Sequence, residues 1–258
     1  MTGTVRVEHD RRGIATLWLA RPEKHNALDA PMIDALASAA ARLGGDRAVR
    51  AVVLRAEGKT FCAGGDLAWM RAQLSADRAS RLHEARRLAE MLLALDAMPK
   101  PLLGAVTGNA FGGGVGLIAV TDVAVSVDTA QFGLTETRLG LIPATIGPYV
   151  AARLGPAARR VFMAGRMFGA TEAVALGLLA LALPTDALED AVSAEAEAYL
   201  ATAPGAVGSA KTLLRRQLNA PGAAEIEASI AALADQWETE EAAQGITAFF
   251  DKRPPPWV

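Results

Sequence analysis

Two glycine-rich turns are the residues of this sequence best suited to chemistry. FCAGGD at 61–66 and FGGG at 111–114 each follow an apolar run and lead into a segment typical of a helix. The first amides of a helix have no partner within it, and the helix dipole adds partial positive charge there. Because glycine lets a ligand approach the backbone closely, each turn is a candidate site for an anion or a carbonyl oxygen.

The same glycines also have a purely structural interpretation, because they allow tight packing of a strand against a helix. Neither turn matches the phosphate-binding pattern G-x-x-x-x-G-K-[ST], and GGGVG lacks the spacing of a dinucleotide-binding loop. The presence of two such turns favours a shared function, since two N–H donors can converge on one carbonyl oxygen. The loss of one such donor typically lowers a rate by ~10²–10³-fold.

Glu136 is the third feature with chemical potential, because it lies in AQFGLTETRLGLIPATIGPYV (130–150), which carries few charges. A carboxylate in apolar surroundings has its pKa raised and can exchange protons near neutral pH. Taken alone, Glu136 is equally compatible with a solvated loop residue or an ion-pair partner of Arg138. Arg138 likewise has two interpretations, as a partner of a substrate carboxylate or as part of a surface ion pair.

Strands and helices must position these residues, and the apolar pattern predicts both. Apolar strands that alternate with helices favour an α/β fold with parallel strand pairing. From residue 156 onward the pattern is almost entirely helical. The predicted elements before that point are strands at 5–8 and 14–19, a helix from 29 to 45, a strand at 51–58, a helix at 77–97, and strands at 102–108 and 123–127.

Composition excludes several classes of protein. The chain has 258 residues and is 52% hydrophobic, which is enough for one large single-core domain or for a core with a small appendage. Its formal net charge of -2 leaves no basic surplus for nucleic acid or anionic membranes. A single cysteine, Cys62, excludes an internal disulfide and fits a reducing compartment. The N-terminal MTGTVRVEHDRRG lacks a secretory apolar region, so we expect a cytoplasmic protein.

The long uncharged stretch between Lys100 and Asp122 has the length of a membrane span. Its six glycines, together with Thr107 and Asn109, fit a buried strand, a turn and the start of a helix better. We therefore expect no membrane association.

Other reactive residues are better explained by structure. His9, His25 and His83 lack a companion at metal-ligand spacing. Cys62 is expected to pack in the core. Asp66 can cap the helix that follows the first glycine turn. Trp69 and Met70 line either an acyl pocket or the core.

These motifs together resemble the crotonase superfamily, the enoyl-CoA hydratases and isomerases. RPEKHNAL, FCAGGDLAWM, GAVTGNAFGGGVGLIAVTDVAV, AQFGLTETRLGLIP and QGITAFFDKR follow the family's order, and the resemblance spans essentially the whole chain. FCAGGDLAWM and FGLTETRLGLIPATIGPYV look most like bacterial methylglutaconyl-CoA hydratase-type members. The resemblance implies a crotonase-like ββα spiral core at 1–200 and a helical C-terminal trimerisation region at 201–258, in a homotrimer or a dimer of trimers.

The resemblance also implies an acyl-CoA thioester substrate, with no separate cofactor and no metal. It assigns the backbone amides of Ala63 and Gly113 to an oxyanion hole, and Glu136 to acid–base catalysis. Ala27 lies in the loop whose backbone meets coenzyme A. The other predicted substrate-binding residues are Gly65, Asp66, Leu67, Trp69, Gly116, Phe249 and Lys252. For Phe249 and Lys252, which match positions that often reach a neighbouring subunit's site, helix packing and a solvated lysine are equally good interpretations.

Gly116 departs from the family's two-glutamate hydratases, which carry their other glutamate at this position. Gly116 is three residues after Gly113, nearly one helical turn, so both face the same way. We expect a void beside Gly116 that holds water or a branched, polar acyl group. Hydration of a 2-enoyl-CoA is the favoured function, because the close sequence context resembles that of hydratases. Glu136 alone must then do the work of two carboxylates, or another group must help; one acid–base group is worth ~10²–10⁴-fold, so its loss need not abolish the reaction. The alternative is a 3-enoyl to 2-enoyl isomerase; decarboxylation and thioester hydrolysis are further chemistries of this fold.

A non-catalytic alternative is an RNA-binding or scaffold protein, because some relatives of methylglutaconyl-CoA hydratases bind RNA through a lysine-rich helix. The matching helix here has Arg42 as its only basic residue. RASRLHEARR at 78–87 carries four arginines and is a candidate basic face. The slightly acidic whole chain favours the enzyme over this alternative.

Overall fold

The strands of the larger sheet are almost wholly apolar, as expected for strands with both faces covered. The computed structural model describes residues 3–218 and 220–258. The sheet has the order β1-β2-β3-β5-β7-β10, in which only the β1–β2 pair is antiparallel. Its strands are β1 (Val5–His9), β2 (Ile14–Leu19), β3 (Ala51–Ala56), β5 (Leu102–Val106), β7 (Val123–Val127) and β10 (Leu181–Leu183).

A smaller sheet collects the short strands that follow the long ones. Its order is β4-β6-β8-β9, and only β8 and β9 pair antiparallel. The chain thus repeats a strand in the large sheet, a strand in the small sheet and a helical segment, which confirms the predicted ββα spiral. The strands are β4 (Thr60–Cys62), β6 (Asn109–Phe111), β8 (Gln131–Gly133) and β9 (Met167–Gly169).

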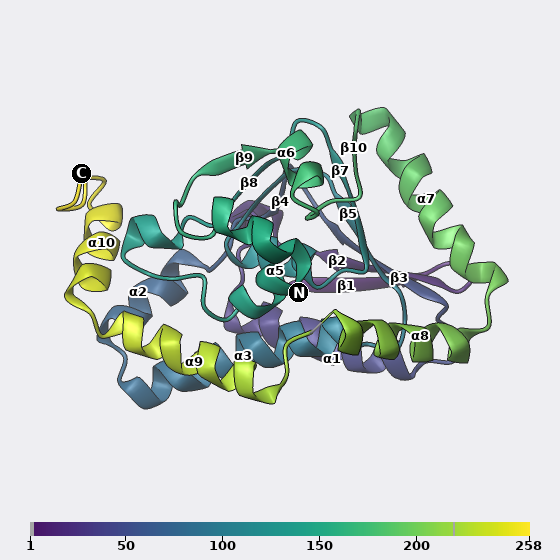
Figure 1. Ribbon diagram of the computed structural model, residues 1–258, viewed down its shortest axis with the longest axis horizontal. Coiled ribbons are helices and arrows are strands. Elements are labelled where there is room, and N and C mark those ends of the chain that lie inside the picture. The colour runs from purple at the N-terminus through teal and green to yellow at the C-terminus, as the bar shows by residue number, and fades with distance from the viewer. Residues whose placement is uncertain (1–2, 219) are drawn as a thin grey trace.

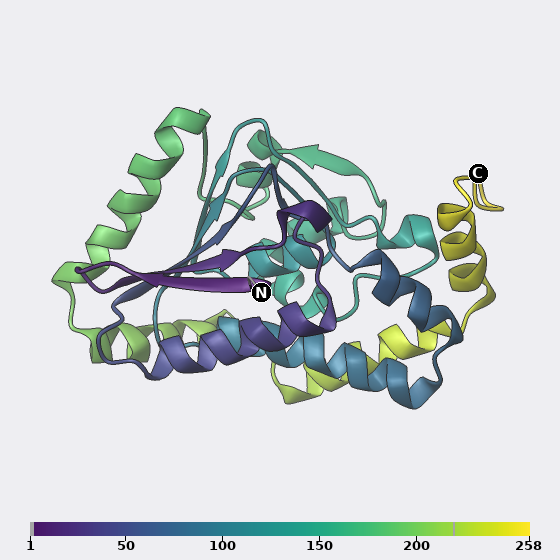
Figure 2. The same cartoon turned by 180° about the vertical axis from the view of Figure 1, so that it is seen from behind.

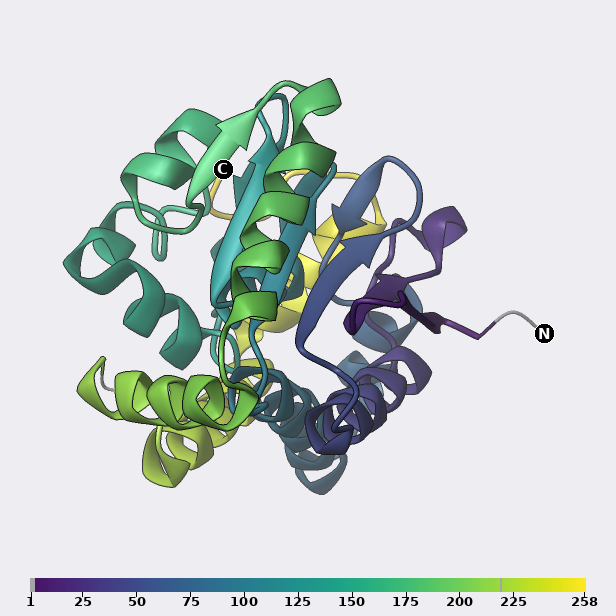
Figure 3. The same ribbon diagram turned by 90° about the vertical axis from the view of Figure 1, so that its right-hand side faces the viewer.

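Long helices cover the sheets on two sides. Helices α1 (Ala30–Gly45) and α3 (Arg78–Asp96) pack against each other, and α7 (Leu188–Ala198) lies across β3, β5 and β7 (Figure 3). Figures 1 and 2 show α1 and α3 running together along one edge of the molecule. The Asp29 side chain accepts a hydrogen bond from the Met32 amide at 3.0 Å, which confirms the predicted helix start.

Shorter helical segments connect the strands. Helix α2 begins directly after the first glycine turn, and α4 begins within the second, at Gly113. These segments are α2 (Leu67–Ser75), α4 (Gly113–Ala119), α5 (Gly147–Leu154), α6 (Ala170–Ala175) and the 3-10 turns Pro22–Lys24, Glu136–Leu139 (η2), Gly155–Arg160, Thr185–Ala187 and Tyr199–Ala201.

The C-terminal part consists of helices that pack on the core and near η2. The elements are α8 (Pro204–Gln217), α9 (Ala223–Trp237) and α10 (Glu240–Phe250), and α10 forms one end of the molecule in Figure 1. A hydrophobic cluster separate from the main core, which includes Leu141, Ile230 and Ile246, joins α9 and α10 to the rest. The prediction of an almost entirely helical chain after residue 156 was wrong, because β9 and β10 each add a strand to a sheet.

The uncharged stretch 101–121 forms β5, β6 and α4, in agreement with the expected strand, turn and helix. Across residues 3–218 and 220–258, no helix is both long and apolar enough to cross a membrane.

Candidate active site

A loop between β2 and α1 holds the first glycine turn in place. Asn26 is fully buried, and its side-chain amide donates to the carbonyl oxygens of Glu57 and Thr60, both at 2.8 Å. Leu28 then pairs with the turn through hydrogen bonds from the Leu28 amide to the Gly64 carbonyl (2.7 Å) and from the Asp66 amide to the Leu28 carbonyl (3.0 Å). The loop therefore behaves as a short strand that fixes the turn.

The second glycine turn lies directly against the first. A Cβ atom on Gly64 would stand 3.6 Å from the Gly113 amide nitrogen and 3.0 Å from the Phe111 carbonyl oxygen. Gly64 and Gly112 also have positive φ angles, of 90° and 47°, which side chains rarely adopt. The bare backbone at both turns thus allows two helix starts to converge on one place.

Glu136 reaches this place from η2. A Cβ atom on Gly112 would lie 2.9 Å from Glu136 Oε1, so the absence of a side chain at Gly112 leaves room for the carboxyl group. Oε2 of Glu136 is buried and has no hydrogen-bond partner among the described residues. Burial raises the pKa of Glu136 to about 7. The carboxyl group is therefore able to take up and release a proton near neutral pH.

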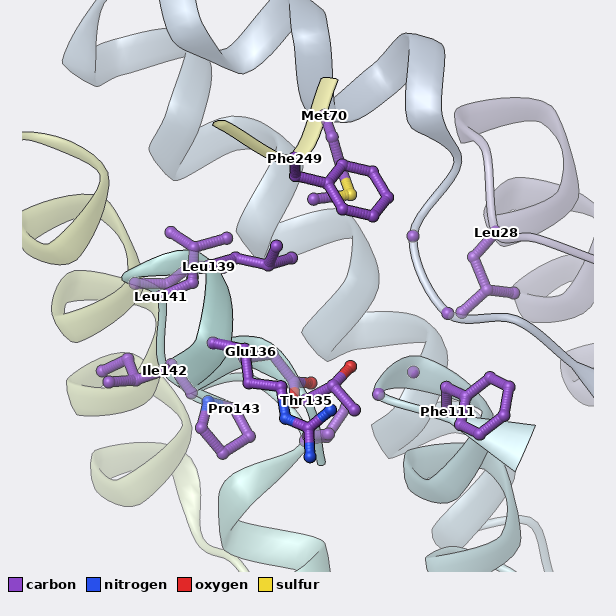
Figure 4. Close-up of a pocket in the computed structure, with 18 of the residues that line it drawn as sticks. Leu28, Met70, Phe111, Thr135, Glu136, Leu139, Leu141, Ile142, Pro143 and Phe249 are labelled. Atoms are coloured by element: carbon purple, nitrogen blue, oxygen red, sulfur yellow. The ribbon is translucent and has the colours of Figure 1, made fainter. Parts of the chain in front are cut away.

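These groups open into one cavity of about 590 Å³. Figure 4 shows Thr135 and Glu136 between apolar side chains that come from several elements. The apolar lining includes Leu28, Trp69, Met70, Phe111, Leu139, Leu141, Ile142, Pro143, Ile146 and Phe249. Such a lining leaves the carboxyl group few polar neighbours and is typical of a ligand pocket.

Ala63 lines the cavity, but the prediction that its amide forms the oxyanion hole is wrong. The Ala63 N–H donates to the carbonyl oxygen of His25 at 3.0 Å, so it is already occupied. Gly65 pairs with Leu28 as the centre of a parallel bridge, an arrangement that directs the Gly65 N–H away from Leu28. Among the described residues, the amides of Gly65 and Gly113 donate to no protein acceptor. These two amides are therefore free to bind an oxygen atom of a ligand, whereas that of Ala63 is not.

The void expected beside Gly116 is filled by Ile146. A Cβ atom on Gly116 would stand 2.9 Å from Ile146 Cβ and closer still to Ile146 Cγ2. Ile146 is 3% exposed and forms part of the cavity wall, whereas Gly116 does not line the cavity. The space that a second carboxylate would need is therefore occupied by an apolar side chain from the start of α5.

Three of the predicted substrate-binding residues besides Gly65 line the cavity, namely Leu67, Trp69 and Phe249. The Trp69 indole Nε1 donates to Glu84 at 3.0 Å, and its ring packs edge-on against Trp237 at 6.4 Å. Trp69 is thus both a cavity wall and a packing residue. Phe249 lines the cavity of its own chain, and 45% of its surface is exposed to solvent.

Three other predicted residues lie outside the cavity lining: Ala27, Asp66 and Lys252. Leu28 takes the place of Ala27 in the lining, and Arg253 takes that of Lys252. Asp66 instead caps α2, since its carboxylate accepts from the Ala68 amide at 2.8 Å and pairs with Arg21 at 3.0 Å.

The surroundings of Asp66 keep its carboxylate ionised. Burial alone would raise its pKa, but hydrogen bonds from the Trp69 and Ala68 amides and the charge of Arg21 outweigh that effect and hold the pKa below its usual range. Asp66 therefore stays ionised as a cap and ion-pair partner. A proton-transfer role would need the opposite shift.

Two polar residues in the cavity extend the predicted site. Arg138 lines the cavity, and within the described part of the chain no carboxylate forms an ion pair with it. Thr145 is 4% exposed and lines the cavity next to Ile146. A threonine in a run such as LIPATIG gives no sequence signal for a site, because only the folded chain shows that it lines the same cavity as Glu136.

The arginine-rich segment 78–87 does not form a free basic face. Arg78 pairs with Asp235 and Glu238, and Arg86 pairs with Glu227. The other two arginines are also engaged: Arg87 pairs with Asp34 and Glu84, and Arg81 donates to the backbone carbonyls of Gln73 and Leu74. These contacts join α3 to α1, α2 and α9.

The histidines and Cys62 lie outside the lining of this cavity. In the part of the chain that the structure describes, no three His, Cys, Asp or Glu side chains are grouped as metal ligands. Cys62 is fully buried, and burial raises its thiol pKa to about 12. Because of this raised pKa, the Cys62 thiol stays protonated near neutral pH, whereas a cysteine nucleophile needs the thiolate form.

Comparison with known proteins identifies the class to which this fold and site belong. Residues 9–258 match the family described as enoyl-CoA hydratase/isomerase, and the chain belongs to this family and to the crotonase superfamily. A Thermus thermophilus protein that carries an enoyl-CoA hydratase name is 36% identical over 254 residues, which cover 96% of this chain and 99% of that one.

Solved structures agree with this classification. An enoyl-CoA hydratase from Mycobacterium smegmatis is 34% identical, covers 98% of both chains and superposes with a TM-score of 0.80. AtuE from Pseudomonas aeruginosa is 36% identical, covers 98% of this chain and 99% of its own, and has a TM-score of 0.78. The chain is therefore similar to these proteins over essentially its whole length.

Proposed function

We propose that the protein is an enoyl-CoA hydratase, which adds water across the 2,3 double bond of a 2-enoyl-CoA thioester. One observation carries this proposal: the Glu136 carboxyl group, with a pKa of about 7, lies in an apolar cavity beside two glycine turns with free amides. The hydratase names of several relatives support the same reaction. Coenzyme A is part of the substrate, and the proposal requires no separate cofactor or metal.

The reaction follows from three groups. The thioester oxygen accepts hydrogen bonds from the amides of Gly65 and Gly113. When the oxygen of water forms a bond to C3, the electrons of the double bond move toward that thioester oxygen, and the amides stabilise the enolate. The Glu136 carboxylate takes one proton from the water and delivers it to C2. Glu136 ends ionised, as it began, so one carboxylate completes the addition.

Water needs a second hydrogen-bond partner besides Glu136 in an otherwise apolar cavity. The Thr145 hydroxyl can supply it, since Thr145 lines the cavity beside the Ile146 that fills the position of a second carboxylate. In this proposal Thr145 orients the water and Glu136 moves its proton. Thr145→Val keeps the side-chain shape and should lower kcat for hydration.

An isomerase is the second candidate, and the filled space at Gly116 favours it. One carboxylate beside an oxyanion hole can take a proton from C2 of a 3-enoyl-CoA and return it to C4, which yields the 2-enoyl isomer. Ile146 keeps water and a second carboxylate away from that part of the cavity. Hydration remains the first proposal because the relatives named above carry hydratase names.

The acyl group is proposed to carry its own carboxylate, as in a branched methylglutaconyl-type substrate. Arg138 supports this, because it lines the cavity and has no ion-pair partner among the described residues. An arginine can bind a carboxylate through two parallel hydrogen bonds. Arg138→Met should raise KM for a glutaconyl-type thioester while it leaves KM for crotonyl-CoA nearly unchanged. Equal changes for both substrates would contradict this role.

We also propose a homotrimer or a dimer of trimers. Helix α8 has no buried residues in the single chain. Its leucines Leu213 and Leu214 are 57% and 51% exposed, and Leu218 just beyond it is 59% exposed. Burial of such side chains against another subunit would be favourable. Light scattering of the purified protein tests this assembly.

The decisive experiment is a paired assay on purified protein. A short 2-enoyl-CoA, 3-methylglutaconyl-CoA and a 3-enoyl-CoA are offered separately, and the conjugated thioester absorbance is followed with product masses. Loss of conjugation with a gain of one water supports the hydratase. A gain of conjugation at constant mass, without hydration, supports the isomerase. Glu136→Gln should remove most turnover and leave CoA binding intact. If no substrate reacts and RNA is retained in a salt-dependent way, the non-catalytic alternative holds.

A further inference from the structure

The turn that carries Glu136 is in direct backbone contact with the C-terminal helix α10. A Cβ atom on Gly245, in α10, would stand 2.5 Å from the carbonyl carbon and from the oxygen of Leu139, the last residue of η2. Van der Waals contacts of a Cβ atom usually begin near 3.4 Å. Gly245 therefore lets α10 approach η2 about 1 Å closer than an alanine would.

Gly140 makes the reciprocal contact from the other side. A Cβ atom on Gly140 would lie 2.5 Å from the carbonyl carbon of Glu241 and 2.8 Å from the Ala242 amide nitrogen. Gly140 also ends η2 with a positive φ of 71°. A hydrogen bond at 2.7 Å from the Gln236 side chain to the Gly140 carbonyl ties the same turn to α9.

We propose that Gly140 and Gly245 are positioning residues for Glu136, because they seat α10 directly on the turn that holds the carboxyl group in the cavity. The inference rests on the proposed function, in which Glu136 carries the proton. Gly245 also lines the cavity, but the proposal assigns neither glycine a contact with the substrate. They act by fixing the position of η2 relative to α10. This position determines how deeply the Glu136 carboxyl group is buried.

Burial is the main cause of the raised Glu136 pKa, so the pKa reports this depth. The charged groups around Glu136 are few and lie on three segments. They are Arg138 on η2 itself, Glu240 and Glu241 at the exposed start of α10, and Asp251, Lys252 and Arg253 just after α10, and none of them is among the causes of the Glu136 pKa shift. Because desolvation, rather than these charges, raises the pKa of Glu136, a shift of η2 toward solvent should lower that pKa.

Gly245→Ala tests the inference, because Gly245 lies within a helix and has no positive φ to complicate the change. The matched control is Gly205→Ala in α8, where a Cβ atom meets nothing within 4 Å. The Glu136 carboxyl is titrated without substrate by infrared difference spectroscopy against Glu136→Gln, and kcat and KM are measured against pH.

In Gly245→Ala, we expect the Glu136 pKa to fall from about 7 toward its ordinary 4.5, and kcat to fall about 10- to 100-fold with little change in KM. The acid limb of the pH–rate profile should move to lower pH. Gly205→Ala should change neither. An unchanged pKa and kcat in Gly245→Ala would overturn the inference. A lowered pKa in a protein whose turnover does not depend on Glu136 would instead refute the proposed function and leave the positioning role standing.

Gln236→Leu decides the question if Gly245→Ala does not fold. It removes the hydrogen bond to the Gly140 carbonyl but adds no atom between α10 and η2. We expect the same direction of change in the Glu136 pKa and in kcat, with a smaller size. A folded Gln236→Leu protein with the wild-type pKa and kcat would refute the role of this contact.

Discussion

Replacement of Glu136 by glutamine should make the protein more stable, and the gain should depend on pH. The pKa of Glu136 rises from an ordinary 4.5 to about 7 in the fold because the carboxyl group is buried. Below pH 4.5 the carboxyl is protonated in both the folded and the unfolded chain, so it has no effect on stability. As pH rises toward 7, the unfolded chain ionises first, and the free energy of unfolding falls. Above pH 7 the loss is complete.

The size of this effect follows from the same two values. Each pH unit between them corresponds to about 1.4 kcal/mol, so ionised Glu136 costs the folded protein about 3 kcal/mol above pH 7. Glutamine keeps the shape and cannot ionise. We therefore expect the difference in unfolding free energy between Glu136→Gln and the wild type to grow by about 3 kcal/mol between pH 4.5 and 8.

Urea denaturation at fixed protein concentration and several pH values measures this difference. Fixed concentration matters because subunit association contributes to apparent stability. Glu23→Gln, at an exposed glutamate of the Pro22–Lys24 turn, is the matched control for the loss of one carboxylate. A Glu136→Gln gain that is constant from pH 4.5 to 8 would refute the burial argument, and with it the physical basis for proton transfer by Glu136.

Three further changes test the structure around the site by urea denaturation. Gly116→Ala should destabilise the fold by about 1–3 kcal/mol because of its clash with Ile146, and Ile146→Ala in the same chain should restore part of that loss; simple additivity of the two changes would contradict the contact. Asp66→Ala should lower the free energy of unfolding by about 0.5–2 kcal/mol through the lost helix cap, and by more if the lost ion pair with Arg21 also contributes. An unchanged free energy of unfolding would show that the cap is unimportant. Asn26→Ala should cost about 1–3 kcal/mol because the carbonyls of Glu57 and Thr60 both lose their donor. It should also lower turnover, since Asn26 fixes the first glycine turn; a loss of stability with full turnover would separate the loop from the site.

Local sequence signals predicted much of this fold because their causes are local. Asp29 starts α1 through its own side chain, and the apolar runs of β3, β5 and β7 need only themselves to be recognised. The strands β9 and β10 were missed because each has three residues, too few to show a period.

The candidate site likewise has features that local sequence predicts and features that only tertiary packing determines. Two glycine turns and a carboxyl group in an apolar segment were visible in the sequence, and the structure brings them together. The filling of the Gly116 space was not visible, because Ile146 lies about thirty residues away and only tertiary packing joins the two. The choice between the amides of Ala63 and Gly65 was equally hidden, since it depends on a hydrogen bond to His25 in a distant loop.

The separation of the two hydrophobic clusters has a consequence for how the protein loses activity. The sheet and its helices share one cluster, whereas α9 and α10 share another with parts of α2 and α3. The contact of Gly140 with α10 joins segments about a hundred residues apart in the chain, and such closures are entropically costly. Local opening of α10 would take away one wall of the cavity and expose Glu136 while the sheet stays folded. Warming should therefore abolish turnover before circular dichroism records the loss of the fold, and amides of α10 should exchange hydrogen sooner than those of β3 and β5.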